Sequence, residues 1–405
     1  MQLDITDLTH DGRGVGRFDT QVYFVAGALP GETVTIHNIQ KKKRYAEADL
    51  ASVDRAAEDR IQSPCPYFPV CGGCDIQHYA YAAGLLWKQK RTRMLFRKAG
   101  VETEVHPAIG MESPWGYRNH LQLQVKNGVS GFFERGSHSI VPVQNCLIQS
   151  ETANRVIQAL QKIVLPADLH RIIVRTEKEQ AMAGFDGAVP SAAIDLLTAA
   201  GVSTIWQRKR KWERIYGKES FYTELSGRQF ALHPDTFFQV NSTMAEQLFS
   251  YALKTMEINP SHNYIDLYCG IGPLGMLAAK QARRITGVEI SQSSVQMAKR
   301  TAKEEGIENI RFLCAPSEAA AENVIKKEKP AGVFVDPPRA GLDAALIDTL
   351  TRLTVPRVVY ISCDPATLAR DAKRFAEQGW TRSAVQPFDL FPWTGHIENV
   401  QCFTR

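Results

Sequence analysis

Residues 264–272 read Tyr-Ile-Asp-Leu-Tyr-Cys-Gly-Ile-Gly, and this stretch decides the fold of the second half of the chain. An apolar strand runs into a Gly-x-Gly turn, and helix-forming residues follow from position 273 to 280. A second apolar strand, 285–290, ends on an acid, Glu289. A tight turn alone would also use such glycines. A strand, glycine turn, helix, strand and acid within about 25 residues predict a site for an adenosine-bearing cofactor, whose ribose hydroxyls Glu289 would bind.

Two further strand ends lie downstream of this unit. Residues 332–335 are an apolar run that closes on Asp336 and two prolines, so we expect Asp336 on a stiff turn. Residues 358–361 are another such run, and Cys363 stands between it and a helix that begins near Pro365. Alternating strands and helices predict a doubly wound, mostly parallel sheet. All these strand ends then meet at the edge of the sheet where ligands bind.

Cys363 has two interpretations. The partial positive charge at the N-terminus of the following helix would favour its thiolate, which is the nucleophilic form. Most free cysteines, however, are small buried core residues. Asp336 has a similar alternative, since an aspartate can simply cap a turn. From its own stretch alone, Cys363 leaves both interpretations open.

Five blocks of sequence carry a resemblance to a known family. They are Phe-Phe-Gln-Val-Asn at 237–241, Asp-Leu-Tyr-Cys-Gly at 266–270, Asp-Pro-Pro-Arg at 336–339, Ser-Cys-Asp-Pro-Ala-Thr-Leu-Ala-Arg-Asp at 362–371 and Gly-His-Ile-Glu-Asn-Val at 395–400. The blocks resemble the signature motifs of the RNA uracil-5-methyltransferases, which use S-adenosylmethionine to make 5-methyluridine. They keep the family's order and approximate spacing, so chance is a poor explanation.

The resemblance implies a role for each block. Cys363 would be the nucleophile that attacks carbon 6 of uracil, and Glu398 would remove the proton from carbon 5, with His396 as the substitute base. Covalent attack is also expected on chemical grounds, because carbon 5 of uracil is too weak a nucleophile to take a methyl group unaided. Otherwise, Glu398 would be a surface acid on a strand. The residues implied to bind S-adenosylmethionine or order its pocket are Gln239, Tyr268, Glu289 and Asp336, the last of which could hold the uracil edge instead.

The composition is that of an ordinary soluble protein. The chain has 405 residues, 44% hydrophobic and 22% charged, which suits two or three domains. Its net charge of +5 is mildly basic and barely favours nucleic acid as a partner. The N-terminus lacks a signal-peptide pattern, and no run of about 18 apolar residues occurs. We therefore expect a cytoplasmic monomer without a membrane partner, whose eight cysteines are reduced or metal-bound.

Residues 1–57 are expected to form a small RNA-binding domain. Short strands at 22–25 and 33–36 are separated by glycine and proline turns, which predicts a five-stranded OB-like barrel. The pattern resembles the TRAM domain attached to many of these methyltransferases. Four cations at 41–44 stand beside Tyr45. We expect them to contact RNA, although a solvated charge run is the alternative.

Cysteines follow at a spacing typical of a metal-binding loop. Cys65, Cys71 and Cys74 are spaced Cys-x5-Cys-x2-Cys among prolines and glycines, and Cys146 is the best candidate for a fourth ligand. On chemistry alone, four thiolates suit structural zinc and a [4Fe-4S] cluster equally well. Family members with this spacing and a distant fourth cysteine carry an iron–sulfur cluster, so the resemblance implies [4Fe-4S].

Residues 58–230 are expected to form a mixed α+β central domain, after a linker at 51–63. A helix is predicted over 79–99, with six cations dense enough to suggest nearby phosphate, and a hairpin is predicted around Asn127-Gly128, with a strand at 171–175. Residues 206–212 interleave cations and aromatics, which fits either RNA contact or an exposed hairpin tip.

The expected fold class is thus α/β: an OB-like barrel, a mixed central domain with an iron–sulfur loop, and a Rossmann-like doubly wound methyltransferase domain at 231–405. The expected function is methylation of carbon 5 of a uridine in RNA, which the enzyme would flip or find in a loop. The layout looks more like the enzymes of 23S rRNA, and tRNA is the alternative substrate. Two other hypotheses are an RNA-binding iron–sulfur protein without activity and methylation of cytosine at carbon 5.

Overall fold

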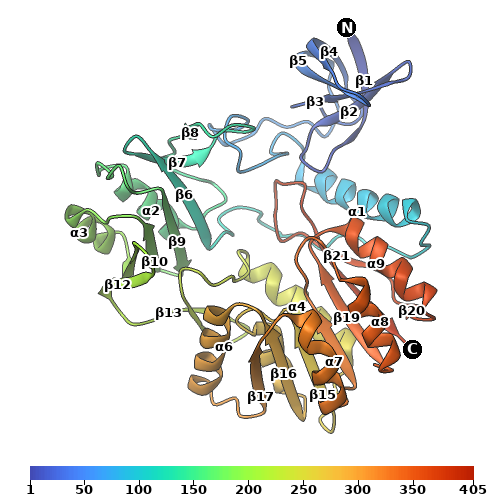
Figure 1. The fold of residues 1–405 in the computed structure, drawn as a ribbon. Coiled ribbons are helices and arrows are strands. Elements are labelled where there is room, and N and C mark those ends of the chain that lie inside the picture. Colours follow the sequence, from blue (N-terminus) through green and yellow to red (C-terminus); the bar gives the residue numbers. More distant parts are fainter.

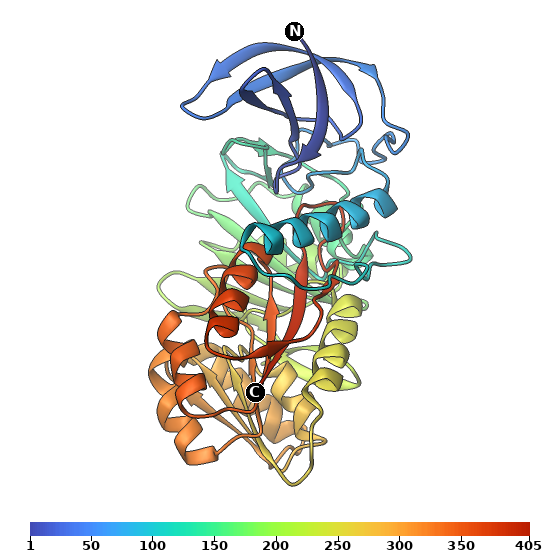
Figure 2. The same cartoon turned by 90° about the vertical axis from the view of Figure 1, so that its right-hand side faces the viewer.

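The structure, a computed structural model, describes all 405 residues. A small barrel at the N-terminus stands apart from two larger parts, a central sheet with helices and a C-terminal sheet between two helical layers (Figure 1). Seen from the side, the molecule is elongated, with the barrel at one end and the C-terminal sheet at the other (Figure 2). None of the helices combines the length and apolar composition that a bilayer crossing requires.

The predicted barrel is confirmed. It closes in the strand order β1-β2-β3-β5-β4. Its strands are β1 (Gln2–Leu8), β2 (Gly14–Phe18), β3 (Gln21–Val25), β4 (Thr33–Lys41) and β5 (Ala46–Arg55). Alternate residues such as Leu3, Ile5 and Val34 fill its core, as the period-two pattern requires. Residues 51–55, expected in a linker, instead belong to β5, because Val53 pairs with Val34.

An irregular cysteine-containing segment connects the barrel to helix α1 (Tyr81–Lys98), which confirms the helix predicted at 79–99. The prediction for its cations is wrong in part. Lys88 is almost fully buried, and its Nζ lies 2.6 Å from Oδ1 of Asp389. Arg91 donates from Nη1 to the carbonyl of Gly395 at 3.1 Å. These two cations therefore hold the C-terminal part of the chain and do not face phosphate.

The central part is a seven-stranded sheet in the order β12-β11-β10-β9-β6-β7-β8. The predicted hairpin and the strand at 171–175 are both present in it. Lys209–Lys211 form an exposed turn between β11 and β12, so the hairpin-tip interpretation of 206–212 holds. The elements are β6 (His120–Lys126), β7 (Val129–Phe133), β8 (Ile140–Val141), α2 (Glu151–Leu160), β9 (Arg171–Glu177), β10 (Gln180–Asp186), α3 (Ser191–Ala199), β11 (Val202–Arg208) and β12 (Trp212–Gly217), followed by the separate hairpin β13 (Phe221–Leu225) and β14 (Arg228–Leu232).

The C-terminal part is an eight-stranded sheet in which β17-β16-β15-β18-β19 run parallel and β22 runs antiparallel to β19. All five predicted strands are present. Helices α4, α5 and α6 cover one face and α7, α8 and α9 the other, so each face has its own apolar core. The elements are α4 (Ser242–Met256), β15 (Asn263–Leu267), α5 (Pro273–Ala279), β16 (Arg284–Glu289), α6 (Gln292–Glu304), β17 (Ile310–Cys314), α7 (Ser317–Glu328), β18 (Gly332–Val335), α8 (Ala344–Arg352), β19 (Arg357–Ser362), α9 (Pro365–Glu377), β20 (Thr381–Arg382), β21 (Gln386–Phe388) and β22 (Glu398–Thr404).

Strand β22 was not predicted from the sequence. It lies beside β19 with Asn399 opposite Ser362, and it also pairs with β20 and β21. Asn399 and Gln401 are fully buried in it, which breaks the apolar pattern that marks a buried strand. This strand brings Glu398, its first residue, to the end of β19.

Candidate active site

Three side chains from three neighbouring strands meet at one edge of the C-terminal sheet. Asp336 follows β18, Cys363 follows β19 and Glu398 opens β22. Cys363 is partly exposed, while Glu398 is only 6% exposed. The sheet thus places a thiol that a substrate can reach beside the buried carboxyl group of Glu398 and the partly exposed carboxyl group of Asp336.

The surroundings of Cys363 keep its thiol protonated. Burial, followed by the negative charges of Glu398 and Asp336, raises the pKa of Cys363 to about 12, against a smaller lowering by Arg339. The expectation that helix α9 favours the thiolate is therefore wrong for this structure. Asp364 caps that helix, accepting from the backbone N–H groups of Ala366 at 2.7 Å and Thr367 at 3.3 Å. Its carboxylate neutralises the positive helix end that would have stabilised the thiolate.

The two carboxyl groups also hold protons more tightly than free acids. Burial raises the pKa of Asp336. Burial and then the charge of Asp336 raise the pKa of Glu398, and Arg339 lowers it. Each ionised carboxylate disfavours ionisation of the other, so both are ionised together only above their raised pKa values. A proton can therefore be taken up or released here near neutral pH.

Arg339 is a functional candidate to which the sequence analysis assigned no role. Its charge acts on both Cys363 and Glu398, and its Nη2 lies 3.4 Å from Nε2 of His396. Burial and then Arg339 lower the pKa of His396. The position of Arg339 in the block 336–339 was the available signal, but the sequence did not reveal which groups it faces.

A buried aspartate fixes the turn that carries Asp336. Oδ2 of Asp371 accepts hydrogen bonds from the hydroxyl of Tyr360 and the backbone N–H of Leu342, both at 2.9 Å. These bonds join α9, β19 and the turn after β18. They tie the turn that follows Asp336 to the strand and the helix on either side of Cys363.

Beside this group lies a cavity of about 50 Å³ at the glycine turn. Three of the four predicted cofactor residues line it: Gln239, Tyr268 and Asp336. Glu289 supports the turn, since its carboxylate accepts from the N–H groups of Gly270 at 3.0 Å and Ser291 at 2.7 Å. The structure thus gathers the predicted cofactor residues around the first strand–turn–helix unit.

Two residues of the glycine turn are constrained. Gly272 has φ of +81°, and a Cβ there would lie 2.6 Å from the ring of Phe312, so only glycine fits. Tyr268 also has positive φ, and its hydroxyl donates to Glu318 at 2.7 Å. Its ring is therefore held at the start of α7, next to the cavity.

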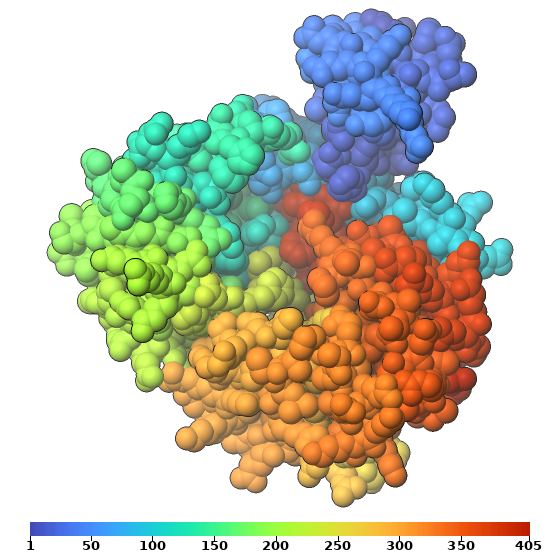
Figure 3. All heavy atoms as spheres, viewed as in Figure 1, coloured from blue at the N-terminus to red at the C-terminus, as the bar shows by residue number.

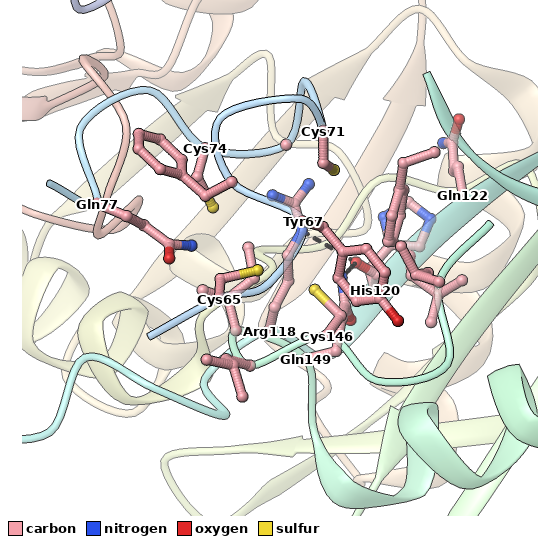
Figure 4. Close-up of a pocket in the computed structure, with 17 residues that line it drawn as sticks. Cys65, Tyr67, Cys71, Cys74, Gln77, Arg118, His120, Gln122, Cys146 and Gln149 are labelled. Atoms are coloured by element: carbon pink, nitrogen blue, oxygen red, sulfur yellow. Dashed lines mark hydrogen bonds between the residues drawn. The ribbon is translucent and has the colours of Figure 1, made fainter. Parts of the chain in front are cut away.

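The four predicted metal ligands line a second cavity of about 340 Å³ (Figure 4). Cys65, Cys71 and Cys74 come from the irregular segment before α1, and Cys146 comes from the loop after β8. Burial, and then the charges of the other three cysteines, raise the pKa of Cys74 to about 12, although a hydrogen bond with Gln77 lowers it. No group of three or more histidine, cysteine, aspartate or glutamate side chains is arranged to hold a metal ion.

Comparisons with known proteins agree with this site. Residues 207–405 match the tRNA (Uracil-5-)-methyltransferase family model, and residues 1–51 match the TRAM domain. RNA methyltransferases described as uncharacterized are similar over nearly the whole chain. The one from Halalkalibacterium halodurans is 34% identical, covering 99% of this chain and 96% of its own. The one from Listeria monocytogenes is 33% identical, with the same coverage.

A solved structure shares the whole fold. The tRNA (uracil-54, C5)-methyltransferase of Pyrococcus abyssi, in complex with S-adenosyl-L-homocysteine, superposes with a TM-score of 0.80 over 100% of both chains at 24% identity. With these relatives over its full length, and with the five sequence blocks gathered around one sheet edge, the chain belongs to the RNA uracil-5-methyltransferase family, whose members are enzymes that use S-adenosylmethionine.

Proposed function

We propose that this enzyme methylates carbon 5 of a uridine in 23S rRNA, with Cys363 as nucleophile and Glu398 as base. The observation that carries the proposal is the meeting of Cys363, Asp336 and Glu398 at one sheet edge, next to the cavity lined by Gln239 and Gly270. A nucleophile, a base and a cofactor pocket within one site are what this reaction needs.

The chemistry starts with attack of the Cys363 sulfur on carbon 6 of the uracil ring. The attack makes the ring an enolate that is nucleophilic at carbon 5, and S-adenosylmethionine would supply the methyl group and leave as S-adenosyl-L-homocysteine. Because the thiol is protonated, its proton must leave as the ring is attacked. Glu398 has to stay ionised for the next step, so Asp336 is the facing carboxylate that takes this proton.

Glu398 then removes the proton from carbon 5 of the methylated adduct. The electron pair of that C–H bond restores the ring double bond and expels the Cys363 sulfur, which recovers its proton from Asp336. The raised pKa of Glu398 suits this step, because a base works best when its pKa lies near the working pH. Arg339 lies where its positive charge would balance the carboxylates during the exchange.

We propose that the four-cysteine cavity holds a [4Fe-4S] cluster with Cys65, Cys71, Cys74 and Cys146 as ligands. The four thiols line one cavity of about 340 Å³, which has room for a group larger than a single ion. Four thiolates suit a [4Fe-4S] cluster and structural zinc alike, and the resemblance of the cysteine spacing to family members with a cluster favours [4Fe-4S]. The role of the cluster would be structural, because methyl transfer moves no net electrons.

Replacing one ligand tests the cluster. Cys74→Ser protein purified without oxygen is expected to lose most of its iron, its acid-labile sulfide and its visible absorption, because serine is a poor ligand for iron–sulfur clusters. The matched control is Cys314→Ser, which changes an exposed cysteine at the end of β17. Wild-type protein that contained zinc and no sulfide would contradict the proposal.

RNA is proposed to approach across the barrel and the hollow beneath it. The space-filling view shows this hollow between the central and C-terminal parts (Figure 3). On the barrel, the guanidinium of Arg13 lies 5.2 Å from the ring centre of Phe24, which in turn lies 5.0 Å from that of Tyr45. The cations at 41–44 are exposed beside them. Stacking rings with neighbouring cations suit single-stranded RNA.

The choice of 23S rRNA rests on the barrel combined with the cysteine loop, and tRNA is the second candidate because the Pyrococcus abyssi relative acts on tRNA. Mapping 5-methyluridine at nucleotide resolution in a strain without the gene decides between them. We expect one 23S rRNA position to lose its methyl group and to regain it with the wild-type gene, but not with Cys363→Ala. Loss confined to tRNA would support the alternative.

A further inference from the structure

We propose that Asp75 and Arg91 are positioning residues for the catalytic base, which they hold in place by clamping Gly395. The inference rests on the proposed function, in which Glu398 is that base. Asp75 directly follows Cys74, so the clamp also makes the active site depend on the order of the cysteine loop. This dependence gives the loop a task in a reaction that needs no redox chemistry.

The cysteine loop is hydrogen-bonded directly to the segment before Glu398. The backbone N–H groups of Asp75 and Ile76 donate to the carbonyl of Trp393 at 2.8 Å and 3.1 Å. In return, the N–H of Gly395 donates to Oδ2 of Asp75 at 3.1 Å. Three hydrogen bonds thus join segments that lie more than 300 residues apart in the sequence.

Gly395 is also held from two other sides. Its carbonyl accepts from Nη1 of Arg91 on α1 at 3.1 Å. A Cβ at Gly395 would lie 1.9 Å from the carbonyl oxygen of His10, in the turn between β1 and β2. The backbone of Gly395 therefore has no room to move towards the barrel. The Asp75 carboxylate and the Arg91 guanidinium hold it by hydrogen bonds.

The same segments share an apolar core. Trp393 is 5% exposed and packs in one cluster with Cys74, Tyr117 and Ile148. Its ring stacks on Trp115 with centroids 4.5 Å apart, and its Nε1 donates to the carbonyl of Pro114 at 2.9 Å. A disturbance of the cysteine loop would therefore reach Trp393 through packing as well as through hydrogen bonds.

Only two residues separate Gly395 from Glu398. On the other side, the segment is fixed by Asp389, which accepts from buried Lys88 and, at 3.0 Å, from the hydroxyl of Tyr81. The chain from Gly395 to Glu398 is short and Glu398 is the first residue of β22, so we expect a shift at Gly395 to displace the Glu398 carboxyl. Displacing a reacting group by about 1 Å can cost about 100-fold in rate.

The inference is tested on the removal of the carbon-5 proton, the step that only Glu398 performs. Asp75→Ala is expected to form a covalent adduct with 5-fluorouridine RNA as fast as wild type, because Cys363 is untouched. On natural RNA it should release tritium from [5-³H]uridine about 10- to 100-fold more slowly and accumulate the methylated protein–RNA adduct. Asp75→Asn keeps an acceptor for the Gly395 N–H and should recover most of the rate. Iron content is measured in both variants.

Arg91→Met is a second variant, which leaves the cysteine loop unchanged. It tests whether the clamp on Gly395 positions Glu398 even if Asp75→Ala fails to fold or loses its iron. It should accumulate the same adduct. Adduct breakdown at the wild-type rate in the folded variants would overturn the inference. Failure of the wild-type enzyme to trap 5-fluorouridine RNA would instead overturn the proposed function, so the two failures are distinguishable.

Discussion

Cys363→Ala is expected to lower turnover by at least about 10⁴-fold, because losing a covalent nucleophile removes the path through the adduct. The residual site could still hold the cofactor, since Gln239 and Gly270 are unchanged. The measurement is methyl transfer from labelled S-adenosylmethionine to RNA, together with trapping of 5-fluorouridine RNA as a covalent complex. We expect neither product from the variant.

Cys314→Ala is the matched control for this change. Cys314 is an exposed cysteine at the end of β17, a strand of the same sheet that is separated from β19 by three others. Both the trapped complex and turnover should stay at wild-type levels in the control. Methylation by Cys363→Ala at a comparable rate would refute covalent catalysis and leave the five sequence blocks in need of another explanation.

Glu398→Gln is expected to lower turnover by about 10²- to 10⁴-fold, the range for a missing general base. Glutamine keeps the shape of the side chain but cannot take the carbon-5 proton, so the methylated adduct between Cys363 and RNA should accumulate. Denaturing gels of reactions with labelled natural RNA would show it as a persistent complex. Wild-type enzyme should pass through the same complex without accumulating it.

The pH dependence provides a second readout for Glu398. Burial and Asp336 raise its pKa, and only the ionised carboxylate can act as base. Adduct breakdown in the wild type should therefore be slow below the raised pKa and accelerate as pH rises through it, well above the range of about 4.3 for a free glutamate. This dependence should vanish in Glu398→Gln and persist in the control Glu308→Gln, which changes an exposed acid before β17. An unchanged profile in Glu398→Gln would assign the base elsewhere, with His396 next in line.

The strand ends could be predicted because each depends on local sequence. Apolar runs followed by glycine, proline or cysteine mark where a parallel strand stops, and parallel strands stop at the same edge. This logic placed Asp336, Cys363 and Glu289 correctly at the edge of the sheet. The barrel followed from short strands with glycine turns in the same way.

The remaining features depend on partners that are distant in sequence. The cation pattern of α1 does not reveal that Lys88 will meet Asp389, which is 301 residues away. The helix after Cys363 suggested a thiolate, but the Asp364 cap and the two carboxyl groups reverse the effect. Strand β22 was missed because its buried Asn399 and Gln401 are polar.

The contact between Gly395 and the carbonyl of His10 limits how far the barrel can be treated as a detachable module. Deleting residues 1–57 would remove a surface for nucleic acid and, at the same time, the turn that packs against Gly395. Lower activity of such a truncation would then combine weaker substrate affinity with a misplaced base. A barrel grafted from a relative would replace the original one only if its first turn packed as closely against Gly395.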